Sequence, residues 1–501
     1  MNKYLEFNIN PLICQIGKNP EDFTKKDIID FVIKNEIRII NFRYAAADGK
    51  LKTLNFTISN YQYLDSILSY GERVDGSSLF PYIETNSSDL YVIPRFSTAY
   101  VDPFASIPTL GILCSYFDKD GLPLDLSPEN TLKKAHKTFQ DKTGYRFEAM
   151  GELEFYLIDT DDTMFPIQDQ KGYHESSPFT KFEGFRTDAM RLIAQSGGQI
   201  KYGHSEVGNF VSNGKIYEQN EIEFLVNPVE SAADQLIMAK WILRTLAYQY
   251  GIDITFSPKV TEGKAGSGLH FHTRIMKGNK SMMIENGKLS DIARTVIAGY
   301  IKCASSLTAF GNTNPTSYFR LVPQQEAPTS ICWGDRNRSV LVRVPLGWTE
   351  NHNMIKIANP LETTADLEIS NRQTVEIRSA DGSADIYNMM AGLIVAARTG
   401  FEMSNAFKVA NETYVDININ NNNNNKNILN TFEQLPTSCH ESAIELNRHR
   451  SIYEKDGVFS PILIDGIISS LNKFEDKNIR DEIKKNPAMM VDIVRRYYHC
   501  G

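Results

Sequence analysis

Residues 151–158 read GELEFYLI, and this short stretch decides the fold that the sequence predicts. Glutamate and apolar residues alternate at its start, so Glu152 and Glu154 lie on one face of an extended strand. Two carboxylates that close repel each other unless a cation or water screens them. The flanking Phe155 and Ile158 indicate a partly buried strand, where a metal ion explains the pair better than water. Taken alone, the pair still fits a charged outer face more simply.

The same spacing by two recurs in three later stretches that also read as strands. They hold the pairs Glu221 and Glu223, His270 and His272, and Glu376 and Arg378. Four strands that each place paired polar groups on one face predict a polar concavity lined by an antiparallel sheet. Glutamates with one or two histidines suit a hard ion, Mg²⁺ or Mn²⁺, better than structural zinc. The recurrence therefore favours a metal site.

The composition limits the classes of protein to consider. The chain has 501 residues, enough for two or three domains, and a net charge of −8. No Lys/Arg block stands out, which disfavours nucleic acid and anionic membranes as partners. No secretory signal is apparent, and the longest strongly apolar stretch, Met389–Ala397, is too short to span a bilayer. Six cysteines without metal-binding or redox spacing indicate reduced thiols, so we expect a cytoplasmic protein.

Turn and cap signals predict an α+β chain with two domains. Residues 1–121 read as strands and turns with one helix at Lys25–Lys34, and the turn-rich stretch Asp118–Pro123 separates them from residues 122–501. Long helices are expected from Ser127 to near Gly144, from Ser231 to Gly251, from Ser290 to near Gly311, and over Ile386–Asn405. The polar tract Asn418–Asn427 predicts a surface loop.

Two further groups of residues favour a bound anion. Gly263–Gly268 is a glycine-rich stretch that lets the backbone approach a ligand, although it lacks the context of a Walker or dinucleotide-binding loop. Arg320 precedes a cluster of three arginines, Arg336, Arg338 and Arg343. A guanidinium can hold a carboxylate or phosphate with two hydrogen bonds. A structural salt-bridge network with the glutamates is the alternative.

These residues belong to motifs whose order resembles the glutamine synthetase family, as a divergent member of the bacterial type. Each motif alone is weakly specific, whereas their shared order from about Arg43 onward is highly specific. The matching stretches are VDGSS (74–78), SDLYVIP (88–94), GELEF (151–155), HSEV (204–207), GSGLHFH (266–272), NPTSYFRLVPQQEAP (314–328), RNRSVLVRVP (336–345) and VEIRSADGSADIYNMMAGL (375–393). The resemblance implies a small N-terminal β-grasp-like domain, followed by a large catalytic domain whose helices surround an antiparallel sheet or half-barrel lined by metal ligands.

The resemblance also implies a site for ATP and for two or three divalent ions, Mg²⁺ or Mn²⁺. The first metal would be held by Glu154, Glu206 and Glu221, and the second by Glu152, His270 and Glu376. The ions would clamp ATP while its γ-phosphoryl group moves to the side-chain carboxylate of glutamate. The other implied roles are those of Arg338 and Arg343 at the phosphoryl group, His272 and Arg378 along the nucleotide and phosphate path, and Arg320 with Gly266 at the substrate glutamate.

In such enzymes ammonia then attacks the acyl phosphate. Ammonium needs an anionic pocket and a base that takes its proton. The matching positions are Asp75, Ser78, Tyr173, Glu206 and Glu326. Glu326 would lie on a flap that closes over the intermediate and excludes water. Asp75 would reach the site from a neighbouring subunit, so the expected partner is a second copy of the chain, in stacked rings that are commonly dodecameric.

The chain departs from the family pattern at several places. Extra residues lie around 209–217 and 346–373, Ala265 stands where an asparagine contacts glutamate, Gln324-Gln325 replaces Gly-Tyr, and Thr374 stands where an arginine is expected. No tyrosine precedes Leu435-Pro436, so regulation by adenylylation is not expected.

Three functions follow from these patterns. The leading one is ligation of glutamate and ammonia to glutamine. The alternative is a ligase that joins glutamate to a polyamine or another primary amine; Asp75 argues against it, while Ala265 and the extra residues leave it open. A non-catalytic sensor or structural relative would have lost metal ligands, and all six are present.

Overall fold

The structure is a computed structural model that describes residues 7–83, 88–162, 164–322, 327–345, 354–363, 370–416, 431–486 and 488–501. The predicted flap residue Glu326, the tract Asn418–Asn427 and much of the extra stretch 346–373 lie outside the described residues. One hydrophobic core fills the N-terminal part, and a larger one lies mostly in the remainder.

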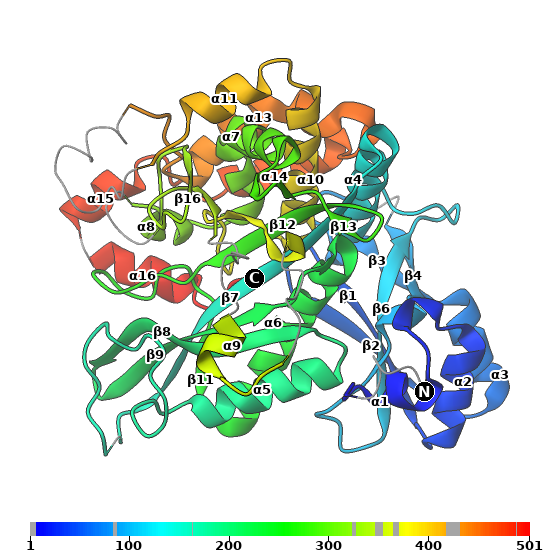
Figure 1. Ribbon diagram of the computed structural model, residues 1–501. Helices are drawn as coiled ribbons and strands as arrows, with labels where there is room; N and C mark the ends of the chain where they lie inside the picture. Colours follow the sequence, from blue (N-terminus) through cyan, green and yellow to red (C-terminus); the bar gives the residue numbers. More distant parts are fainter. Residues whose placement is uncertain are drawn as a thin grey trace.

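A six-stranded sheet forms the N-terminal part (blue and cyan in Figure 1). Its strands follow the order β2-β1-β6-β4-β3, with the short β5 beside β6, and only β1 and β6 run parallel. The strands are β1 (Ile39–Ala45), β2 (Leu51–Thr57), β3 (Glu72–Asp75), β4 (Asp89–Pro94), β5 (Tyr100–Val101) and β6 (Thr109–Phe117), with helices α1 (Pro11–Ile16), α2 (Lys25–Lys34) and α3 (Tyr61–Tyr70). This arrangement confirms the predicted small β-grasp-like domain.

Local sequence explains two features of this domain. Helix α2 begins after Thr24, whose hydroxyl and the Asp27 carboxylate form a reciprocal capping box. The β1–β2 hairpin turns at Asp48 and Gly49, where Gly49 has φ of 74°, a value that glycine adopts without strain. The Asp48 carboxylate accepts the backbone N–H of Lys50 at 3.1 Å and so fixes the turn.

A ten-stranded sheet is the centre of the remaining chain. Its main path is β16-β17-β18-β12-β7-β9-β8, and all neighbours on it are antiparallel except β16 and β17. The strands are β7 (Arg146–Thr160), β8 (Ile200–Ser212), β9 (Lys215–Phe224), β10 (Asn227–Pro228), β11 (Asp253–Thr255), β12 (Leu269–Lys277), β13 (Lys280–Ser281), β16 (Trp333–Asp335), β17 (Val342–Val344) and β18 (Val375–Ile377), while β14 (Ile284–Glu285) and β15 (Lys288–Leu289) pair separately. The predicted helix-surrounded antiparallel sheet is confirmed.

Helices pack around this sheet, and α7, α10, α13 and α14 gather on one side (Figure 1). They are α4 (Pro128–Thr143), α5 (Glu183–Gln195), α6 (Val229–Tyr250), α7 (Asp291–Gly311), α8 (Ser317–Arg320), α9 (Met354–Ala358), α10 (Ile386–Glu402), α11 (Ala406–Glu412), α13 (Cys439–Glu454), α14 (Pro461–Asn472), α15 (Ile479–Lys485) and α16 (Ala488–Arg496). None of the helices in the described ranges is long and apolar enough to cross a membrane.

The helix boundaries agree with the sequence except at two ends. Helix α7 begins after Ser290, whose hydroxyl accepts the N–H of Ala293, as a serine cap predicts. The expected cap at Ser231 is wrong, because α6 begins at Val229 with Pro228 in the cap position. Helix α10 ends at Glu402, three residues before the expected Asn405.

Candidate functional site

Four neighbouring strands, β18, β12, β7 and β9, bring the paired polar residues into register. On β7, Glu152 lies opposite His270 of β12 and Glu223 of β9. The next pair along β7 and β9 is Glu154 with Glu221, and His272 of β12 lies opposite Glu376 of β18. Because every second side chain points to the same face, these residues form adjacent rows on one side of the sheet.

One cluster is centred on the carboxylate of Glu152. Nδ1 of His270 lies 3.0 Å from one of its oxygens, and Nε2 of His272 lies 2.9 Å from the other. The carboxylate of Glu376 is 3.6 Å from His270, and donor atoms of Glu152, His272 and Glu376 all lie within 4.8 Å of one another. Arg343 and Arg378 pair with Glu376 at 2.9 and 3.0 Å.

A second cluster forms where β8 meets β9. Nε2 of His204 lies 3.3 Å from Glu221, and donor atoms of His204, Glu206 and Glu221 lie within 4.8 Å of one another. A third group joins the two clusters, because Glu221 and Glu223 reach Glu152 within the same distance. Glu154 instead accepts the backbone N–H of Gly268 at 2.6 Å and the side-chain amide of Gln219 at 3.0 Å.

The buried carboxylates of these clusters lie so close together that their pKa values are shifted. Burial, reinforced by the charges of Glu152, Glu154, Glu206 and Glu223, raises the pKa of Glu221 well above its ordinary value. Burial likewise raises the pKa of Glu154, and one buried carboxylate oxygen of Glu223 lacks a hydrogen-bond partner among the described residues. Several carboxylate oxygens therefore lie close together with their negative charge only partly balanced. One or more divalent cations would balance that charge.

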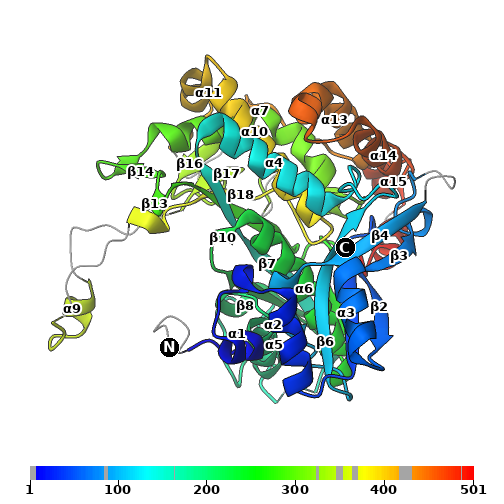
Figure 2. The same cartoon turned by 90° about the vertical axis from the view of Figure 1, so that its right-hand side faces the viewer.

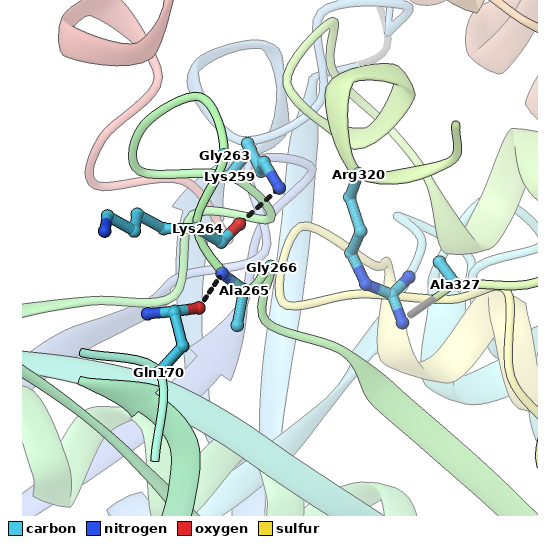
Figure 3. Close-up of a pocket in the computed structure, with 8 residues that line it drawn as sticks. All are labelled: Gln170, Lys259, Gly263, Lys264, Ala265, Gly266, Arg320 and Ala327. Carbon is cyan, nitrogen blue, oxygen red and sulfur yellow. Dashed lines mark hydrogen bonds between the residues drawn. The ribbon is translucent and has the colours of Figure 1, made fainter. Parts of the chain in front are cut away.

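A cavity of about 230 Å³ adjoins these clusters (Figure 3). It is lined by the glycine-rich stretch and by the buried guanidinium of Arg320, which lies 3.3 Å from His270. A side chain at Gly266 would meet Arg320 at 2.9 Å, and one at Gly268 would meet His270 at 2.7 Å. Both glycines therefore permit the close packing of the loop against these groups.

Gln170 lines the same cavity opposite Arg320 (Figure 3). Its side-chain oxygen accepts the N–H of Ala265 at 2.7 Å, and its side-chain nitrogen donates to the backbone carbonyl of Asn209 at 3.2 Å. Gln170 has φ of 57°, an uncommon conformation for a residue other than glycine. The Gln170 side chain thus links Asn209 to Ala265 at the wall of the cavity.

Of the other predicted residues, Asp75 and Ser78 lie apart from this centre, whereas Tyr173 and Arg338 border it. Asp75 and Ser78 are exposed on the N-terminal sheet and bonded to each other at 2.8 Å, and the end of the molecule that carries β3 lies well away from β17 and β18 (Figure 2). Tyr173 lies near the second cluster, with its ring centre 5.5 Å from that of His204. Arg338 is exposed, and its backbone carbonyl accepts a hydrogen bond from Arg378.

Sequence reasoning left four residues out of the candidate set. Glu223 was found by the spacing rule as the partner of Glu221 but was given no role, and His204, two residues from Glu206, follows the same rule. Gln219 follows the same rule with Glu221. Nothing in the sequence pointed to Gln170, because its contacts depend on chain segments that are distant in sequence.

Binding of a divalent ion should depend on pH in a defined direction. Because the pKa values of Glu221 and Glu154 are raised, both carboxylates keep protons to a higher pH than ordinary glutamates, and a cation must displace those protons. Mg²⁺ should therefore raise the unfolding temperature by about 3 °C or more at pH 8 and by less at pH 6. Thermal melts with and without Mg²⁺ measure this, and Glu221→Gln should flatten the difference. An equal shift at both pH values would contradict the expectation.

Two protein-family models match this chain, one in its N-terminal part and one over most of the remainder. Residues 36–119 match the model described as "Glutamine synthetase, beta-Grasp domain", and residues 125–490 match "Glutamine synthetase, catalytic domain". The glutamine synthetase of Clostridium saccharobutylicum is 29% identical over 430 residues, which cover 84% of this chain and 88% of the relative. That of Staphylococcus epidermidis is 28% identical over 438 residues, covering 86% and 90%.

Solved structures share the fold. A cryo-EM structure of Plasmodium falciparum glutamine synthetase aligns with a TM-score of 0.73 at 19% identity, covering 91% of this chain and 97% of that one. A GmaS/ADP complex aligns with a TM-score of 0.71 at 17% identity, covering 92% and 99%.

Proposed function

The chain belongs to the glutamine synthetase family, and on that premise we propose that it ligates L-glutamate and ammonia to L-glutamine at the polar face of its ten-stranded sheet, with ATP as the energy source. The observation that carries this assignment is the register of β18, β12, β7 and β9, which assembles acidic and imidazole donors beside three arginines. The reaction is an ADP-forming amide ligation through γ-glutamyl phosphate.

Six residues would hold the divalent ions in this proposal. They are Glu152, Glu154, Glu206, Glu221, His270 and Glu376. When bound, Mg²⁺ or Mn²⁺ neutralises phosphate charge and polarises the transferred phosphoryl group. His204, Glu223 and His272 lie close enough to orient or supplement these ligands.

The remaining roles fall to groups that bind anions and to groups that bind ammonium. Arg338 and Arg343 hold the phosphoryl group, with His272 and Arg378 along the phosphate path. Arg320 binds the α-carboxylate of glutamate, and the Gly266 loop lines that pocket. Ammonium is attracted by the carboxylates of Glu206 and Asp75 together with Ser78 and Tyr173, and a carboxylate takes its proton before the nitrogen attacks. Glu326 covers the intermediate.

The active protein is proposed to be a ring-shaped homo-oligomer in the cytoplasm, with a dodecamer of stacked rings as the specific form. Its support is the position of Asp75 and Ser78, which the fold holds on the N-terminal sheet, apart from the clusters of the same chain. The division into domains at residues 121 and 122 stays a prediction.

The substrate amine separates the leading function from its alternative. Purified protein with ATP, Mg²⁺ and glutamate should release phosphate at a rate that ammonium increases by about tenfold or more over its absence. Phosphate release is measured for ammonium and, separately, for putrescine and methylamine at equal concentrations. A larger response to either amine than to ammonium would replace this proposal with a glutamate–amine ligase.

Gln170 should contribute to glutamate binding. Gln170→Ala removes the acceptor of the Ala265 N–H and the side-chain donor to the Asn209 carbonyl, while the backbone bond from residue 170 to Asn209 remains, so the loop at Ala265 loses its support. The expected result is an increase of about tenfold in KM for glutamate, roughly the loss of one buried hydrogen bond, with KM for ATP unchanged. The exposed Gln168→Ala is the matched control. Equal increases in both KM values would contradict a role confined to the glutamate pocket.

A further inference from the structure

Gln219 of β9 is a buried residue to which the proposed reaction gives no role. Its side chain is 2% exposed and lies on the same face of the strand as Glu221, two residues further along. Its hydrogen bonds reach a proposed metal ligand, the glycine-rich stretch and strand β8. Gln219 therefore contacts both the metal clusters and the stretch that lines the cavity in Figure 3.

The side-chain nitrogen of Gln219 joins a metal ligand to the wall of this cavity. It donates to the carboxylate of Glu154 at 3.0 Å and to the backbone carbonyl of Gly266 at 3.0 Å, with a longer contact of 3.3 Å to the hydroxyl of Ser267. An amide nitrogen has two hydrogens, so the two shorter bonds use both. One amide group thus bonds at once to the carboxylate proposed to hold the first ion and to the loop proposed to hold glutamate.

The side-chain oxygen of Gln219 faces a third segment. It accepts the backbone N–H of Gly208 at 3.1 Å, two residues after the proposed ligand Glu206. A side chain at Gly208 would lie 2.5 Å from this oxygen, so the strand approaches it closely only because the residue is glycine. The Gly208 N–H can only donate and the Gly266 carbonyl can only accept, so these partners fix the orientation of the amide.

The carboxylate of Glu154 carries a second bond to the same stretch. The backbone N–H of Gly268 donates at 2.6 Å to the oxygen that also accepts from Gln219. Restraint of this carboxylate by a cation therefore reaches the glycine-rich stretch at two points, of which Gln219 supplies the one at Gly266.

The position of Gly266 matters to the glutamate pocket. It packs against Arg320, so closely that an added side chain would meet the arginine at 2.9 Å. Arg320 is proposed above to bind the α-carboxylate of glutamate. A loop that is already held in place loses less conformational freedom when the ligand arrives, and binding is stronger for that reason.

We propose that Gln219 is a positioning residue that couples the two sites, so that the first divalent ion and glutamate each strengthen the binding of the other. The inference rests on the proposed function, which places the ion at Glu154 and glutamate beside Gly266. Because the coupling is a difference in binding free energy, its factor is the same in both directions.

Ligand binding without turnover tests this coupling. Isothermal titration calorimetry of the full-length chain, without ATP, gives Kd for glutamate with and without saturating Mg²⁺, and Kd for Mg²⁺ with and without saturating glutamate. In the parent chain each ligand should lower the Kd of the other by about tenfold. Gln219→Met keeps the length of the side chain and removes its N–H donors, so both factors should fall to about threefold or less, with the bond from Gly268 to Glu154 remaining. Gln219→Asn, a smaller change that shortens the amide by one methylene, should show the same loss.

Gln235→Met is the matched control, because it makes the same change at another buried glutamine. Gln235 lies on α6, and its side-chain oxygen accepts from the Gln199 N–H and the Asn227 side chain. This variant should lower the unfolding temperature and leave both factors at the parental value.

The outcomes separate this inference from the ligase assignment. Gln219 variants that weaken both ligands but keep the parental factors would show a purely structural role and overturn the coupling, as would an equal loss of the factors in Gln235→Met. A parent chain that binds both ligands without mutual effect would overturn the coupling and leave the ligase assignment intact. Failure of the parent chain to bind glutamate at all would overturn both.

Discussion

Replacing Glu152 with glutamine should lower kcat by about 10³-fold, an effect of roughly 4 kcal/mol on the barrier. Its two carboxylate oxygens lie within 3.0 Å of His270 and His272, and Glu152 also belongs to the group with Glu221 and Glu223. The histidines hold the pKa of Glu152 well below its ordinary value despite its burial, so the native group is a carboxylate. Glutamine keeps the shape and removes the charge.

The measurement should separate catalysis from folding. Glu148, four residues earlier on the same strand, is a buried glutamate that pairs with Arg274 at 2.7 Å outside the site. Glu148→Gln should lower the unfolding temperature and keep kcat within about threefold of the parent chain. Glu152→Gln should instead retain the fold and lose Mg²⁺-dependent stabilisation. If both variants lost activity in proportion to stability, Glu152 would have only a structural role.

Mixing two inactive variants should restore activity. Asp75→Ala alone should reduce the use of ammonia far more than the binding of ATP, since Asp75 is proposed to complete the site of a neighbouring chain. Refolded together in equal amounts, Asp75→Ala and Glu152→Gln chains should recover up to about one quarter of the parental activity. One combination in four joins an intact Asp75 from one chain to an intact sheet from the other.

The control for this experiment mixes two variants that both carry their substitution on the ten-stranded sheet. Every site in a mixture of Glu152→Gln and Arg343→Ala contains one damaged sheet, so that mixture should stay inactive. Recovery is read as glutamine formed per milligram after the oligomers exchange subunits. An Asp75→Ala mixture with no more activity than the average of its two components would mean that each site is built within one chain.

The spacing of polar residues was enough to predict the strands that carry the site. Alternation in GELEFYLI fixed which face Glu152 and Glu154 share, and the same argument placed His270 with His272. It could not predict that β12 lies between β7 and β18, because the order of strands depends on contacts between distant segments. The pairing of His204 with Glu221, in contrast, is local, because both lie in the hairpin formed by the consecutive strands β8 and β9.

The helix ends show a different limit. Ser290 was recognised because its hydroxyl caps α7 in the structure as well as in the pattern. Ser231 failed because Pro228, which has no N–H to lose, already stands at the start of α6 and lets the helix begin at Val229. Competing cap signals within three residues cannot be ranked from sequence alone.

Because the site residues lie in register on neighbouring strands, the chain tolerates insertions and deletions only at certain places. Deleting Phe271 from β12 would turn one of the two imidazoles to the opposite face, whereas added residues at a strand end leave every row aligned. Of the two stretches expected to be additional, residues 209–217 lie in the paired ends of β8 and β9 and in the turn between them, beyond His204 and Glu221, and residues 346–373 lie in the chain between β17 and β18. A change of length at either place leaves Glu152, His270 and Glu376 in register.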